Sequence, residues 1–158
     1  MKKIVFENVS LSFGSHELFK NLSCEFAAGK VFGIIGKNGS GKSTFLKLAA
    51  QIIKPDSGEV KIIGLKSVAA VTPELKIYDD LTAAENLKFF AKLRGTAVNF
   101  SEMGARVDLD FENKIRAGDF STGMKQRLKF AILLSVDADI WLLDEPTANL
   151  DENGREIL

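Results

Sequence analysis

The sequence predicts an α/β fold, and two stretches of chain carry that prediction. Residues 31–35 form a short apolar run, followed by a glycine-rich loop and then by apolar residues at helical spacing. Residues 140–143 form a second apolar run that ends in two adjacent acids, Asp144 and Glu145. Short, continuously apolar strands are typical of a mostly parallel sheet that is covered on both faces.

The glycine-rich loop fits the P-loop pattern G-x-x-x-x-G-K-[ST], which cradles nucleotide phosphates. Its glycines let the backbone turn tightly and point successive N–H groups into one concavity. Lys42 can reach the β- and γ-phosphates, and the Ser43 hydroxyl can ligate Mg²⁺. The residues assigned to nucleotide binding here are Gly36, Asn38, Gly39, Ser40, Gly41, Lys42, Ser43 and Thr44. A glycine-rich turn that binds nothing is the alternative, and the flanking strand and helix patterns argue against it.

The segment after the loop predicts a helix that begins near Gly41 and stops before Pro55. Apolar side chains recur at helical spacing as far as Ile53, while Lys47 is left for water. The positive end of this helix would add to the phosphate site.

The two acids after residue 143 form the second informative group. In a P-loop protein, Asp144 can hold Mg²⁺ and Glu145 can orient or deprotonate the attacking water. The alternative is an acidic pair that only opens a surface loop.

Composition restricts the class of protein. The chain has 158 residues, about the size of one domain, with 21 basic and 21 acidic side chains. No global field therefore recruits nucleic acid or anionic lipid. Cys24 is the single cysteine, so we expect no internal disulfide and a reducing compartment. No apolar run approaches the roughly 18 residues of a membrane span, and Glu7 follows the basic start too soon for a signal peptide.

The remaining patterns predict further elements. Strands are expected at 2–6, 9–13, 18–26, 59–63 and 68–71. Thr82 and Glu85 have capping-box spacing at the start of a helix that Gly95 ends. A short helix is expected near residues 100–107, a loop around 110–119, and a helix after Gly123.

With these pieces assembled, the chain resembles the nucleotide-binding domain of ABC transporters over essentially all of its residues. Residues 36–43 resemble the Walker A loop, and residues 140–147 resemble Walker B with its catalytic glutamate and the following Pro-Thr. Residues 148–151 are similar to the D-loop. Residues 120–127 (Phe-Ser-Thr-Gly-Met-Lys-Gln-Arg) resemble the signature motif, which separates ABC proteins from other P-loop ATPases.

The resemblance implies a role for each site residue, with ATP and Mg²⁺ as cofactors. Lys42 and Glu145 would be catalytic, Glu145 as the general base, and Ser43 with Asp144 would hold the metal. Phe13, which the residues alone favour as a core aromatic, would stack on adenine. Ser121 and Gly123 would complete the nucleotide site of the opposite subunit, beside Asp151, and Gln126 would also be a nucleotide-binding residue.

The resemblance also implies an architecture and partners. It implies a P-loop NTPase core with a mostly parallel sheet, an N-terminal antiparallel β portion and an inserted helical subdomain at about 75–118. Residues 1–158 would form a single ABC-type domain that lacks its C-terminal strands and switch-histidine region. The partners would be a second nucleotide-binding domain and transmembrane permease subunits, with no nucleic acid. The location would be cytoplasmic, on the inner face of the cell membrane.

Three departures from the family pattern stand out. Thr122 replaces a signature glycine and Met124 replaces its glutamine. The Q-loop glutamine should fall near residue 73, where only Glu74 could substitute. The one histidine, His16, is far from the position of a switch histidine.

Three alternatives remain open at this point. A soluble ABC protein acting on ribosomes or DNA would often carry tandem ATPase units. A non-hydrolytic ATP-binding module would fit the missing glutamine and histidine. A P-loop kinase would leave the signature and the acid pair unexplained. The transported substrate and the direction of transport are not encoded in these motifs.

Overall fold

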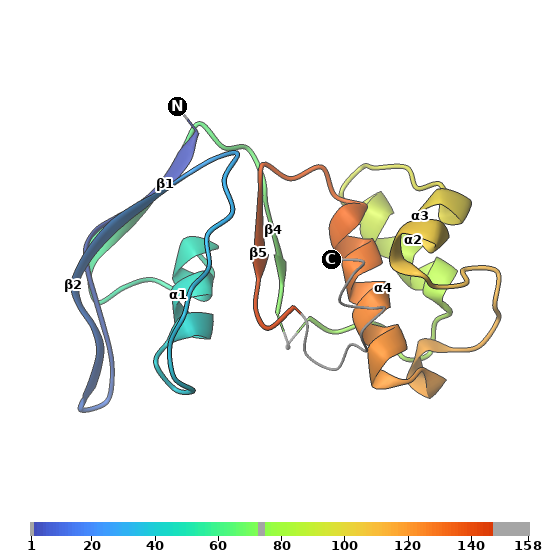
Figure 1. Ribbon diagram of the computed structural model, residues 1–158, viewed down its shortest axis with the longest axis horizontal. Helices are drawn as coiled ribbons and strands as arrows, with labels where there is room; N and C mark the ends of the chain where they lie inside the picture. The colour runs from blue at the N-terminus through green and yellow to red at the C-terminus, as the bar shows by residue number, and fades with distance from the viewer. Residues whose placement is uncertain (1, 73–74, 147–158) are drawn as a thin grey trace. The chain divides into compact units, whose positions relative to one another are not determined.

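The structure is a computed structural model that describes residues 2–72 and 75–146. The chain divides into two compact units (Figure 1). Unit 1 comprises Met1–Ala70 and Ala138–Asp144, and unit 2 comprises Val71–Asp137 and Glu145–Leu158.

Unit 1 contains a three-stranded antiparallel sheet. Its strands are β1 (Lys3–Phe13), β2 (His16–Ala27) and β3 (Ser57–Ile63), in the order β2-β1-β3. Both neighbouring pairs are antiparallel, which confirms the predicted N-terminal antiparallel portion.

The two short strands predicted at 2–6 and 9–13 are one continuous strand. Asn8 takes a left-handed φ of 48°, and its N–H donates to Ser23 Oγ at 2.9 Å. The register of β1 against β2 shifts between Phe6 and Val9 as a result. Such a bulge interrupts the alternation of side chains without ending the strand, which is why the pattern resembled two strands.

Helix α1 (Lys42–Ala49) packs on this sheet and contributes to its core. The rings of Phe45 and Phe6 stack with centroids 4.5 Å apart and planes 8° apart. The helix is shorter than predicted because Gln51 takes a left-handed φ of 55°. The Gln51 amide donates to Val60 O at 2.9 Å, which stabilises this early end.

Strands β4 (Val68–Val71) and β5 (Ile140–Leu143) are hydrogen-bonded neighbours and run in the same direction (Figure 1). Ile140 and Leu142 pack against the core of unit 1, whereas Trp141 and Leu143 are exposed. The predicted strand at 140–143 is confirmed, but the expectation that it is buried is wrong.

Residues 31–35 are not a strand, which corrects a second prediction. Four apolar side chains in this segment are exposed: Val31, Phe32, Ile34 and Ile35. A strand forms only when neighbouring strands satisfy its N–H and C=O groups. None of the strands in the described part of the chain pairs with this segment.

Unit 2 is helical in the residues that the structure describes. It contains α2 (Ala83–Leu93), α3 (Phe100–Val107), the 3₁₀ turn η1 (Ala117–Asp119) and α4 (Thr122–Leu134), and α4 packs against α2 and α3. The predicted capping box is confirmed. Thr82 Oγ1 accepts from Glu85 N at 3.3 Å and Glu85 Oε2 accepts from Thr82 N at 2.8 Å.

Gly95 follows α2 with a left-handed φ of 71°, as its predicted place at the end of this helix requires. Across residues 2–72 and 75–146, no helix combines the length and the apolar character needed to span a bilayer.

Candidate functional site

The glycine-rich loop joins residues 31–35 to α1. Gly39 and Gly41 have left-handed φ values of 80° and 92°, which L side chains rarely adopt. A Cβ on Gly41 would also lie 2.9 Å from Leu18 Cδ2. The loop therefore requires glycine at these two positions, as the motif predicts.

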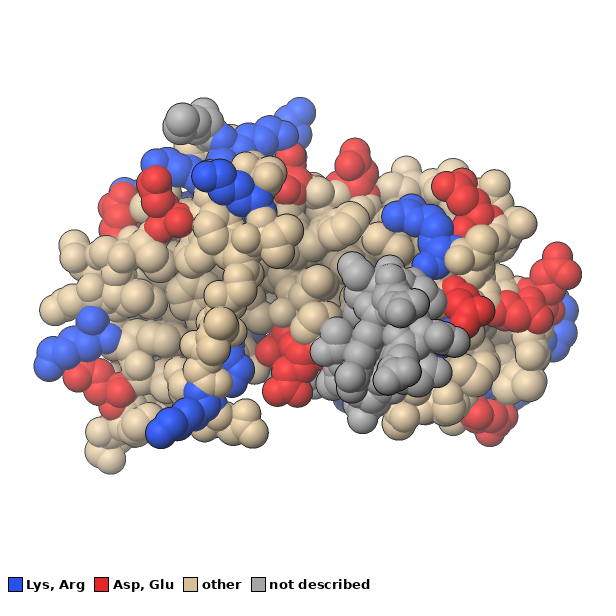
Figure 2. Space-filling model, viewed as in Figure 1, with Lys and Arg blue, Asp and Glu red and all other residues tan. Residues whose placement is uncertain are grey.

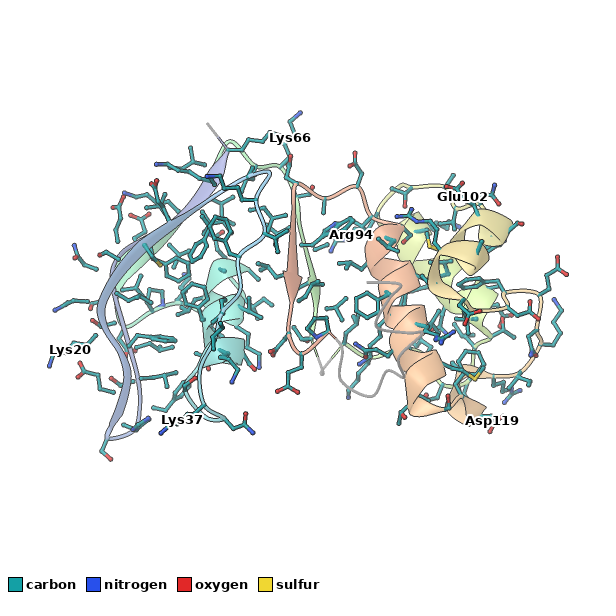
Figure 3. All side chains as sticks on the ribbon, in the orientation of Figure 1. Lys20, Lys37, Lys66, Arg94, Glu102 and Asp119 are labelled. Carbon is teal, nitrogen blue, oxygen red and sulfur yellow. The ribbon has the colours of Figure 1, made fainter. Side chains whose placement is uncertain are left out.

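Lys42 is the first residue of α1 and its side chain folds back over the loop. Its Nζ donates to Gly36 O at 3.0 Å and to Lys37 O at 3.1 Å. Lys37 lies in the loop itself and is labelled in Figure 3. The ammonium is thus held by two neutral carbonyl groups, which an anion entering the loop can replace with a stronger charged partner.

The start of α1 favours an anion. No acidic residue lies in its first turn, so nothing on the helix neutralises the positive end of its dipole. Ser43 is exposed in this first turn and Thr44 follows it half-buried. Backbone N–H groups at a helix start bind phosphates readily, and the Ser43 hydroxyl is accessible to a metal.

β5 ends at the same end of unit 1 as the loop before α1 (Figure 1), and Asp144 is the next residue in the chain. Its side chain is buried, with 6% of the residue exposed. In the described part of the chain no buried side-chain oxygen lacks a hydrogen-bond partner, so the Asp144 carboxylate is not an orphaned charge. Carboxylate and hydroxyl oxygens are the ligands that Mg²⁺ prefers, so Asp144 together with the Ser43 hydroxyl fits a magnesium site.

Glu145 is the next residue and is exposed. Its backbone takes a left-handed φ of 48°, which is uncommon for a residue other than glycine. Residues held in such conformations cluster at functional sites. The bend turns the chain sharply between a buried acid and an exposed one, so the two carboxylates have different environments and can have different roles.

Gln126 lies on α4, and its amide Nε2 donates to Pro146 O at 3.2 Å. This contact lies within unit 2 and connects α4 to the residue that follows Glu145. Sequence reasoning assigned Gln126 to the nucleotide and missed this contact, because no local pattern indicates which side chain meets the carbonyl of a distant proline.

The signature residues lie at the start of α4. Ser121 is the N-cap, and its Oγ accepts from Met124 N at 3.2 Å. Its hydroxyl proton stays available to donate. Gly123 is in the first turn of α4. The N-terminus of this helix therefore has the serine and the glycine that suit an anion-binding site, as the motif predicts.

Phe13 is the last residue of β1 and is 58% exposed. It faces His16 across the tight turn that joins β1 to β2. The interpretation of Phe13 as a core aromatic is wrong, because the ring lies outside the core cluster. An exposed ring at a strand end is suited to stack on a flat ligand.

Two further candidates, Asp151 and Glu74, lie outside the described residues. The same is true of Thr147 and of the D-loop at 148–151. Their roles stay predictions.

Comparison with known proteins places these features in a family. The model of the ABC transporter family matches residues 19–148. The chain is 35% identical to the "ABC transporter ATP-binding protein NatA" of Bacillus subtilis, over 87% of this chain and 63% of that protein. It is also 35% identical to the "Cytochrome c biogenesis ATP-binding export protein CcmA" of Agrobacterium fabrum, over 92% of this chain and 75% of that protein.

Among solved structures, the chain is similar to the dimeric ATP-binding cassette MJ0796 in a post-hydrolysis state, bound to ADP and phosphate. The TM-score is 0.83 at 24% identity, over 98% of this chain and 78% of that one. This likeness confirms the predicted fold. The chain spans less than two thirds of the length of NatA, 63%. The glycine-rich loop, the acids after β5 and the family match together show that this chain is an ATP-binding domain of the ABC transporter family.

Proposed function

We propose that this chain binds and hydrolyses ATP to energise an ABC transporter, working as an ATP-sandwich dimer. The observation that carries the proposal is the left-handed glycine loop before Lys42, with Asp144 directly after β5 in the same unit. Relatives with matching sequence are named as ATP-binding transport or export proteins.

The residues of unit 1 divide the work of binding. Lys42 and the loop N–H groups hold the phosphates, and Phe13 stacks on the adenine ring. Ser43 and Asp144 would hold Mg²⁺, which neutralises charge on the β- and γ-phosphate oxygens. Glu145, which follows Asp144 in the chain and belongs to unit 2, would accept a proton from the attacking water, for which its exposed position is suitable.

Dimerisation would complete each site. In this proposal Ser121 and Gly123, beside Asp151, complete the nucleotide site of the opposite subunit. The dimer of MJ0796 with ADP and phosphate supports this arrangement by its similar fold. Phosphoryl transfer relies mainly on positioning and electrostatics, so a half-assembled site is expected to be nearly inert.

The exposed apolar segment supports the proposal that the complete protein has further strands. Val31 and Ile35 are fully exposed, and Trp141 and Leu143 of β5 are exposed as well. Additional strands would cover these side chains and pair with their backbone. The native polypeptide is then expected to have a mass well above 17.3 kDa, and a native mass equal to that value would contradict this part of the proposal.

Unit 2 would contact the membrane partner. Phe89 and Leu93 are exposed on α2, within the predicted helical subdomain at 75–118. Apolar side chains exposed together suit a protein interface, here with permease subunits on the cytoplasmic face of the membrane. Figure 2 shows basic and acidic side chains interspersed on the viewed face, which supports the expectation that nucleic acid is not a partner.

Sedimentation of the complete protein carrying Glu145→Gln tests this function. The variant keeps the phosphate site but cannot accept the proton, so saturating ATP with Mg²⁺ should produce a stable dimer without turnover. A monomer under these conditions would contradict the sandwich. Absence of phosphate release from the wild-type protein with its permease would instead favour a non-hydrolytic ATP-binding module.

A further inference from the structure

Asp56 lies in the turn between α1 and β3, and it joins that turn to the end of β1. Its N–H donates to Ser10 O at 2.9 Å, and its Oδ2 accepts from Ser12 N at 2.7 Å. None of the motifs in the sequence includes Asp56.

The Asp56 carboxylate lies where β1 extends beyond the start of β3. β1 and β3 are paired as far as Ser10 opposite Ser57, where β3 begins. Beyond that point β1 continues for three residues to Phe13, with β2 alone beside it. The Ser12 N–H would have no acceptor on the β3 side, and the Asp56 carboxylate takes the place of the missing strand carbonyl. An acceptor that carries charge makes a stronger bond than a neutral one.

The segment held in this way carries the exposed ring. Ser12 precedes Phe13 directly, and Phe13 is followed by Gly14 with a left-handed φ of 59°. The register against β2 is irregular between Leu11 and Ser12. Pairing with β2 alone therefore leaves this strand end weakly fixed, and the bond from Asp56 fixes it from the other side.

We propose that Asp56 is a positioning residue for the adenine ring: by accepting the Ser12 N–H it holds the Phe13 side chain where it stacks on the base. This inference rests on the proposed function, in which Phe13 contacts adenine. Asp56 directly precedes β3, seven residues after Ala49, the last residue of α1.

The test compares two ligands on the complete protein by isothermal titration: ATP, which has a base, and inorganic tripolyphosphate, which has none. Asp56→Ala should weaken ATP binding by about threefold to tenfold, the range of an aromatic stacking contact. Tripolyphosphate binding should change less than about twofold, because the loop at 36–43 is intact. Asp56→Asn keeps a side-chain oxygen acceptor and should restore ATP binding to within about twofold of the wild type.

A double-mutant cycle separates positioning from general destabilisation. In a Phe13→Ala background, Asp56→Ala should have almost no further effect on ATP affinity, because the ring it positions is gone. Asp110→Ala is the matched control. Asp110 Oδ1 also accepts a backbone N–H, from Glu112 at 2.8 Å, but it lies in unit 2. This control should leave both affinities unchanged.

The outcomes are distinct. A wild-type protein that binds neither ligand would overturn the proposed function itself. A protein that binds both, but whose ratio of ATP to tripolyphosphate affinity is unaffected by Asp56→Ala, would overturn the positioning role and leave the proposed function intact. An effect of Asp56→Ala that persists at full size without Phe13 would also overturn it. Should Asp56→Ala fail to fold, Asp56→Glu replaces it, because glutamate displaces the carboxylate by one methylene. The ratio of ATP to tripolyphosphate affinity and the double-mutant cycle with Phe13→Ala are then measured for that variant.

Discussion

The amide nitrogen of Gln126 lies 3.2 Å from the carbonyl oxygen of Pro146, to which it donates a hydrogen bond. The bond connects α4, which begins at the signature residues, to the turn in which Glu145 takes a φ of 48°. A strained backbone persists only when its surroundings fix it. Gln126 is one of the groups that fix this turn.

Replacing Gln126 with methionine should therefore slow hydrolysis without weakening ATP binding. Methionine has a similar length but cannot donate, and loss of about 1 kcal/mol corresponds to roughly a fivefold lower kcat. KM should be unchanged. Steady-state kinetics of the complete protein measure both constants. Glu102→Ala, an exposed change on α3, is the control, and a wild-type kcat for Gln126→Met would contradict the role of this bond.

Asp139 predicts a dependence of stability on acid pH. Its pKa is lowered from 3.8 to about 2, first by the Lys2 ammonium and then by the N–H of Lys66, which Figure 3 labels. The folded state therefore prefers the ionised carboxylate. Its contribution to stability is complete above about pH 4 and is lost as the pH falls toward about 2.

The substitution Asp139→Asn should lower the Tm at pH 7, and the difference from the wild type should narrow between about pH 4 and pH 2. Thermal unfolding followed by circular dichroism measures this. Asp80→Asn, at a carboxylate that is 96% exposed, should change the Tm little at any pH. A difference for Asp139→Asn that stays constant down to pH 2 would show that the ionised form is not what the fold stabilises.

Gly58 is expected to be indispensable for the β1–β3 contact. It has a φ of 79°, and a Cβ there would lie 2.2 Å from Asn8 O. Gly58→Ala should therefore lower the free energy of unfolding by about 3 kcal/mol or more, from the backbone clash and the left-handed strain together. Gly29 has a similar φ of 76° with nothing within 4 Å of the added Cβ.

Gly29→Ala is thus a matched control that adds the strain without the clash, and it should cost only about 1 kcal/mol. Urea denaturation monitored by tryptophan fluorescence compares the two variants. Equal losses would mean that the clash with Asn8 relaxes freely and that Gly58 is needed for its φ alone.

Local patterns predicted the parts of the fold that local interactions determine. The capping box at Thr82 and Glu85 and the glycine after α2 were correct because each involves neighbours along the chain. The loop before Lys42 was also predictable, since its glycines are required by backbone conformation. The conformation of residues 31–35 was not predictable in this way, because an apolar run becomes a strand only when other strands pair with it.

The contacts between distant residues were likewise out of reach of the sequence. The Asp56 bond to Ser12 depends on where β3 begins opposite β1. The Gln126 contact with Pro146 depends on the packing of unit 2. Each involves a polar side chain with no motif of its own, so the positioning residues emerge only from the folded structure.

The most direct test of the central claim is the titration of the complete protein with ATP after Lys42→Ala. The ammonium that now rests on the carbonyl oxygens of Gly36 and Lys37 would hold the phosphates, so its removal should weaken ATP binding at least about tenfold. Lys54→Ala, an exposed lysine of unit 1 outside the loop, should bind ATP as the wild type does. If Lys42→Ala gives the same titration curve as the wild type, the loop does not hold the triphosphate and the proposed function is wrong.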